Sequence, residues 1–189
     1  MMLLVVLGGI TVVVLVYVVV VYNRLVSLRQ HIRDSWAGIQ VELKRRYDLI
    51  PNLVETVRGY AGHERTVLER VIELRNRAMA NEGSPAQQSG DEMALVAGVR
   101  GVIALGEAYP ELKADTMFRQ LQTELVDTED RIAATRRFYN GNVREINETV
   151  RQFPSSIVAG MFGFESAEYF ELEDAREGAA PRVDVPRPS

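Results

Sequence analysis

The hydrophobic pattern begins with an uninterrupted apolar segment, residues 1–22, that contains no charged side chain. A helix rises about 1.5 Å per residue, so roughly 20 apolar residues cross about 30 Å of hydrocarbon. In lipid a helix satisfies its own backbone hydrogen bonds, which outweighs the low helix propensity of the many valines. The alternative, a cleaved signal peptide, requires a basic start and a small-residue cleavage site, and neither is present. We therefore predict a single, uncleaved transmembrane helix.

After this span, apolar residues recur at steps of three and four, which indicates amphipathic helices. The first stripe runs from Leu25 to Leu43. Its helix should end near residues 47–49, because Pro51 disfavours a helical conformation at the preceding residue. Pro51 also fits the first turn of a new helix, so a second helix is predicted over residues 51–80.

A glycine- and proline-containing polar stretch, residues 81–90, predicts a loop. A third helix should follow over residues 92–109, with Asp91 as its N-terminal cap and Pro110 as its end. This third helix contains three glycines, which makes it the weakest of the predicted helices.

A seven-residue apolar repeat from Phe118 to Phe153 predicts a long fourth helix over residues 113–153. Such a repeat favours left-handed supercoiled packing. The intermediate positions after Leu121 are polar (Thr128, Thr135, Asn142 and Thr149). We expect this second stripe to lie at a bundle edge or to form hydrogen bonds across it.

The predicted fold class is therefore all-α, with an N-terminal single transmembrane helix followed by an antiparallel four-helix bundle. We divide the chain into a transmembrane anchor (1–22), a bundle (23–170) and an acidic, proline-rich tail (171–189). The tail has little to bury, so it is predicted to be disordered.

Composition limits the chemistry and the partners. The chain has no cysteine, which removes disulfides, thiolate metal sites and cysteine nucleophiles. The net charge of −4 gives no overall attraction to nucleic acid, so we predict no nucleic-acid partner. The predicted partners are the lipid bilayer, through residues 1–22, and a protein partner or a second copy of the chain.

Three arginines follow the span closely: Arg24, Arg29 and Arg33. The positive-inside tendency therefore favours a cytoplasmic location for the bundle of this single-pass cell-membrane protein. Asp34 lies on the same flank, and the opposite topology stays open.

The most specific motif in the sequence is Leu43-Lys-Arg-Arg-Tyr-Asp-Leu-Ile-Pro-Asn-Leu-Val54, and Tyr109-Pro-Glu-Leu-Lys-Ala-Asp115 and Phe153-Pro-Ser155 add to it. Together these motifs resemble the LemA family of membrane-anchored helical proteins. The resemblance extends over nearly everything from Tyr22 to Phe170. It implies an N-terminal span and an antiparallel four-helix bundle, and it implies no reaction.

Candidate reaction chemistry is sparse. His31 and His63 lie on different predicted helices without metal-ligand spacing, and no phosphate loop or nucleophile motif is recognisable. We predict no catalytic residue, no cofactor and no metal site, hence no enzyme.

Two polar clusters are candidates for other roles. Lys44, Arg45 and Arg46 form the densest basic cluster, which is either a charged helix end or a docking surface for an acidic partner. The far half of the fourth helix is rich in polar side chains that should set its register against the first and second helices by buried hydrogen bonds, or else bind a partner or ligand: Arg136, Arg137, Tyr139, Asn140, Asn142, Arg144 and Asn147.

An even number of antiparallel helices returns the chain to its starting side, so the end of the fourth helix should lie near the bilayer. The segment that follows could then lie at the membrane interface, where aromatic residues are favoured. The alternative is that it folds onto the bundle as ordinary core. The candidate membrane-contact residues are Ile157, Phe162, Phe164, Tyr169 and Phe170.

We interpret the chain as a membrane-anchored, non-enzymatic interaction or scaffold module. Two alternatives stay open: a membrane-remodelling or curvature-associated protein, and a ligand-binding bundle or enzyme.

Overall fold

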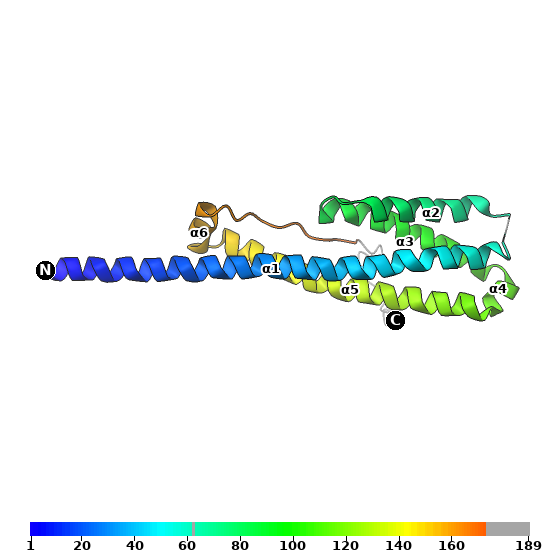
Figure 1. The fold of residues 1–189 in the computed structure, drawn as a ribbon, viewed down its shortest axis with the longest axis horizontal. Helices are drawn as coiled ribbons and strands as arrows, with labels where there is room; N and C mark the ends of the chain where they lie inside the picture. Colours follow the sequence, from blue (N-terminus) through cyan, green and yellow to red (C-terminus); the bar gives the residue numbers. More distant parts are fainter. Residues whose placement is uncertain (62, 173–189) are drawn as a thin grey trace, which may run out of the picture.

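The computed structural model describes residues 1–61 and 63–172, and these residues form helices and connecting segments without a strand (Figure 1). The all-α prediction is confirmed. The four long helices are α1 (Met2–Arg58), α2 (Arg65–Ala80), α3 (Pro85–Glu107) and α5 (Thr116–Arg151), and the short ones are α4 (Pro110–Ala114) and α6 (Ser155–Met161).

Helix α1 joins the apolar segment to the bundle without a break. Among the described residues it is the one helix long and apolar enough to cross a membrane, and only 6% of its most apolar window is buried in protein. A core helix of a soluble protein would be mostly buried. The N-terminal part of α1 projects alone beyond the other helices (Figure 1), as the predicted anchor requires.

The predicted break at Pro51 is wrong, because α1 continues through it to Arg58. A proline inside a helix leaves the carbonyl four residues earlier without its helical donor. Here that carbonyl belongs to Tyr47, and it accepts a hydrogen bond of 2.8 Å from Arg75 Nε on α2. A contact between helices thus satisfies the group that the proline leaves unpaired.

The turn between α1 and α2 lies at Gly59, instead of at Pro51, so α2 begins at Arg65. Helix α3 begins earlier than predicted, at Pro85, where the Ser84 backbone N–H donates to Gln87 Oε1 at 3.2 Å. Residues 85–90 therefore belong to a helix and the predicted loop is shorter.

Asp91 is not the cap of α3. It lies within that helix, is buried, and accepts from Arg77 Nε and from Asn81 Nδ2, each at 2.6 Å. Asp91 thus ties α3 to the end of α2.

Helix α5 begins at Thr116, where the Asp115 side chain accepts from the Phe118 backbone N–H at 3.0 Å. The predicted apolar repeat is buried from Phe118 to Ile146. The repeat fails at Phe153, which lies beyond the end of α5 at Arg151 and is 82% exposed.

The polar side chains at the intermediate positions of α5 form two kinds of hydrogen bond. Thr128, Thr135 and Thr149 return hydrogen bonds to carbonyls of their own helix. Asn142 bonds across to α1, donating to Ser35 Oγ at 3.2 Å.

Helices α1 and α3 run away from the free end of α1, and α2 and α5 run back towards it (Figure 1). Because α2 and α3 are short, they cover only the distal part of α1, whereas α5 follows α1 almost to its free part. The distal core joins α1, α2, α3 and α5. A second, membrane-proximal core joins Val21, Leu25 and Leu28 of α1 to Ile146, Val158, Ala159 and Phe164.

After α6 the chain returns along α5 as an extended segment, residues 165–172, which we call the strap (Figure 1). The predicted tail therefore begins with two residues, Glu171 and Leu172, whose carbonyls accept from Ser89 and Arg136. The prediction of disorder for residues 173–189 lies outside the described residues.

Candidate functional site

A buried ionic cluster joins three helices. Arg46 of α1 is fully buried, and its Nη1 donates to Glu129 Oε1 of α5 at 2.5 Å while its Nη2 donates to Glu92 of α3. Glu92 is also fully buried and accepts from the Tyr47 hydroxyl and, at 3.2 Å, from Gln88 Nε2. The buried ion pair thus joins α1 to α3, and the partly exposed Glu129 extends the cluster to α5.

Burial alone would lower the pKa of Arg46, but the negative charges of Glu129 and Glu92 outweigh it and raise that pKa, so the guanidinium stays charged. Burial, and then the charge of Glu92, raises the pKa of Tyr47, so its hydroxyl stays protonated and donates. Arg46 and Tyr47 therefore each keep one protonation state around neutral pH.

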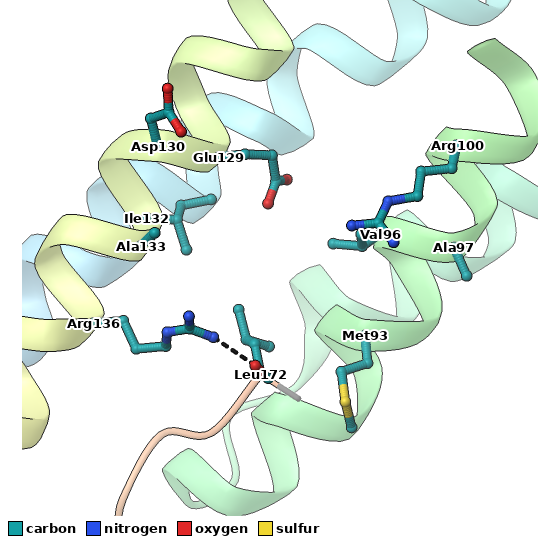
Figure 2. A pocket seen from close by; sticks show the side chains of 10 residues that line it. All are labelled: Met93, Val96, Ala97, Arg100, Glu129, Asp130, Ile132, Ala133, Arg136 and Leu172. Carbon is teal, nitrogen blue, oxygen red and sulfur yellow. Dashed lines mark hydrogen bonds between the residues drawn. The ribbon is translucent and has the colours of Figure 1, made fainter. Parts of the chain in front are cut away.

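Beside this cluster a pocket opens between α3 and α5, and Glu129 belongs to both. The cavity holds about 250 Å³. Figure 2 shows Glu129 and Arg136 reaching into it from α5 and Arg100 from α3. The lining residues are Met93, Val96, Ala97, Arg100, Glu129, Asp130, Ile132, Ala133, Arg136 and Leu172. We call this the α3–α5 pocket.

The strap closes one end of the α3–α5 pocket. Asn147 and Asn140 each bind the strap backbone twice, Asn147 through the N–H and carbonyl of Ala167 (2.7 and 3.0 Å) and Asn140 through those of Phe170 (both 3.0 Å). Arg136 Nη1 then donates to the Leu172 carbonyl at 2.7 Å (Figure 2). One face of α5 thus recognises an extended backbone, and the pocket lies next along that face.

The three basic residues predicted as a docking surface do not share a surface. Lys44 is exposed and pairs with Asp48 at 2.9 Å, and Arg45 is exposed, but Arg46 is buried in the ionic cluster. A docking role therefore stays a prediction for Lys44 and Arg45 alone, and Arg46 cannot contribute to it.

The candidate membrane-contact residues divide into two groups. Ile157, Phe162 and Tyr169 are 56%, 48% and 37% exposed. Phe164 and Phe170 are buried, in the membrane-proximal and the distal core, so the reading as ordinary core holds for these two.

The predicted polar cluster on α5 is only partly a contact between helices. Asn142 does contact α1, whereas Asn140, Asn147 and Arg136 bind the strap. Tyr139 also contacts the strap, donating to the Glu168 carbonyl at 2.9 Å.

His31 lies on α1 and His63 in the turn before α2, and both are exposed. Within residues 1–61 and 63–172, no three histidine, aspartate or glutamate side chains are grouped so as to hold a metal ion.

Sequence reasoning missed the ionic cluster, although its signals are present. Arg46 lies at helical spacing between Leu43 and Ile50 on the buried stripe of α1, and Glu92 lies likewise before Leu95 on α3. A charged residue on an apolar stripe requires a partner, and pairing two such residues would have identified the cluster.

The LemA family model matches residues 35–185, most of the chain. The chain belongs to the LemA family. Its α1 anchor and helical fold correspond to the membrane-anchored bundle that the sequence motifs implied.

The relatives of this LemA-family chain include proteins named MamQ and a protein named LemA. "Magnetosome protein MamQ 2" of Paramagnetospirillum magneticum is 25% identical over 179 residues, and the match covers 82% of this chain and 66% of the relative. The corresponding MamQ of Magnetospirillum gryphiswaldense is 24% identical over the same extent. "Protein LemA" of Metamycoplasma hominis is 26% identical over 164 residues, covering 86% of this chain and 72% of the relative. The chain thus spans slightly less than two thirds of the length of the MamQ relatives.

Proposed function

We propose that this LemA-family protein is a membrane-anchored, non-enzymatic interaction module that binds an extended segment of a partner protein in the α3–α5 pocket. The observation that carries the proposal is the strap. Side chains of α5 bind its backbone in an extended conformation, and the α3–α5 pocket lies along the same face, with Leu172 among its lining residues.

The chemistry of the pocket supports a peptide ligand. Apolar side chains such as Met93 and Val96 offer a surface for a partner's side chains, while Arg136 and Glu129 offer a donor and an acceptor. Small-molecule sites commonly have volumes of about 300–1,000 Å³. At about 250 Å³ the cavity suits one or two side chains better than a cofactor.

Photocrosslinking in native membranes tests this function. A photoreactive residue at Met93, which lines the pocket and is 38% exposed, should give a discrete adduct with a partner protein. The matched control is Val126, which is on α5, is 59% exposed and does not line the pocket. Equal adducts at both positions, or none at Met93 under efficient crosslinking, would refute the proposal.

We further propose that the bundle lies on the cytoplasmic side. The support is the arginine-rich flank after the span, Arg24, Arg29 and Arg33. Because the chain has no cysteine, a Phe138→Cys variant carries one thiol, at a position that is 65% exposed. A membrane-impermeant maleimide should label this thiol only after the cells are opened, and labelling of intact cells would establish the opposite topology.

A further inference from the structure

The turn between α5 and α6, together with α6 itself, carries a cluster of exposed apolar side chains. Phe153 is 82% exposed, Met161 70%, Ile157 56% and Phe162 48%. Ile157 and Met161 are four residues apart on α6, so they share one helix face. Contiguous apolar patches on a soluble surface mark contacts with another molecule or with a membrane. We call these four residues the α6 patch.

Contacts on the opposite face of α6 show at which level along α1 this patch lies. Val158 and Ala159 pack in the membrane-proximal core with Val21 and Leu25. The ring of Phe162 lies 4.8 Å from that of Tyr22. The α6 patch therefore lies beside the C-terminal end of the apolar segment.

The turn before α6 reaches still further towards the N-terminus of α1. Phe153 and Pro154 line one cavity together with Tyr17, Val20 and Val21 of α1. These three residues belong to the predicted span. Phe153 therefore lies beside the apolar segment of α1.

The length of the apolar segment indicates where this level of α1 lies relative to the bilayer. Residues 2–22 of α1 extend over about 30 Å, the thickness of the hydrocarbon. Tyr22 then lies at its boundary, where tyrosine is favoured. The first charged residue is Arg24, and it pairs with Glu145 of α5 at 3.3 Å, both half-exposed, which marks the level of water and headgroups.

We propose that the α6 patch is a membrane-contact surface, inserted into the interfacial region of the bilayer that α1 spans. Burial in the interface removes the patch from water, and aromatic side chains are stable at that depth. The protein is then attached at two points, a transmembrane helix and a short helix in the interface. Two attachments restrict rotation of the bundle about α1, so the α3–α5 pocket keeps a fixed orientation relative to the membrane.

Depth-resolved fluorescence quenching tests this contact on the full chain. The absence of cysteine allows one environment-sensitive label per variant, at Met161→Cys or Ile157→Cys. Val12→Cys, at the middle of the span and 60% exposed, is the lipid-exposed reference. Phe138→Cys on α5 and Val41→Cys on α1, 65% and 67% exposed, are the water-exposed references. Each variant is reconstituted in phosphatidylcholine vesicles that contain nitroxide lipids, with the nitroxide either at the headgroup or in the acyl chain.

Labels at Met161 and Ile157 should be quenched several-fold more strongly than the two water-exposed references, with shallow nitroxides more effective than deep ones. The label at Val12 should be quenched best by deep nitroxides. Quenching at both patch positions equal to that at Phe138 would overturn the proposal. Protection from water without quenching by any lipid nitroxide, increasing with protein density, would also overturn it, because a second copy of the chain would then cover the patch. Far-UV circular dichroism of each variant verifies that the fold is kept.

Discussion

The ionic cluster at Arg46 provides a quantitative test of what holds the bundle together. Replacing Arg46 with Met removes the charge and leaves Glu92 fully buried with donors only from Tyr47 and Gln88. Removing one partner of a buried ion pair costs about 3–5 kcal/mol. The other partner, Glu129, has a side chain that is 42% exposed and can return to water, so it adds about 0–1 kcal/mol at most. We expect Arg46→Met to lower the free energy of unfolding by about 3–5 kcal/mol.

A double substitution separates the stranded charge from lost packing. Arg46→Met with Glu92→Leu removes both buried charges, and apolar replacements of buried pairs are often neutral or stabilising. Tyr47 and Gln88 can still bond to each other, at 3.3 Å. The double variant should therefore be more stable than Arg46→Met alone, which is a favourable coupling in a double-mutant cycle.

Denaturant unfolding in one detergent, followed by the helical circular dichroism signal, measures these differences. Arg45→Met is the matched control, because Arg45 is the exposed neighbour and should change stability by less than about 0.5 kcal/mol. A loss below about 1 kcal/mol for Arg46→Met, or a double variant whose loss equals the sum of the single losses, would refute the reasoning.

Other predictions address packing, the strap and pH. Gly106→Ala places a Cβ against the ring of buried Phe118, so it should lower the free energy of unfolding by about 1–3 kcal/mol. Gly101→Ala on the same helix meets no atom within 4 Å, so it should raise the free energy of unfolding by about 0.4–1 kcal/mol. Asn140→Ala removes two bonds to the strap and should accelerate hydrogen exchange of strap amides while α2 amides stay protected; unchanged strap exchange would contradict it. Burial, then nearby Glu168, raises the pKa of Tyr139 to about 12, above the unfolded value of about 10, so folding stability should fall between about pH 10 and 12. Tyr139→Phe should reduce that fall, as seen in unfolding midpoints across this range, and an unchanged fall would argue against it.

The helices were largely predictable because their apolar spacing repeats over many turns, whereas their ends depend on tertiary contacts. Pro51 satisfies every local rule for a helix boundary, yet Arg75 from α2 supplies the donor that lets α1 continue. Asp91 satisfies the rules for a cap, yet its side chain pairs with Arg77. A residue of another helix decided the outcome at Pro51, whereas at Asp91 the start of α3 at Pro85, after Ser84, left Asp91 inside the helix.

The candidate site was predictable in outline only. The position of α6 near the span was predictable, because this position depends only on the number and direction of the helices. The α3–α5 pocket depends on how far two helices stand apart, and the strap depends on how Asn140 and Asn147 pair with a distant backbone. Neither leaves a periodic signal in the sequence.

The central claim, that the anchored bundle acts by binding a partner in the α3–α5 pocket, is tested most directly by blocking that pocket. Ala97→Trp fills it from α3, and Val126→Trp places the same side chain on the exposed surface of α5 outside the pocket. Quantitative affinity purification from native membranes should then recover a partner with the unmodified chain and with Val126→Trp, and lose the same partner with Ala97→Trp. Equal recovery with all three chains would contradict the account.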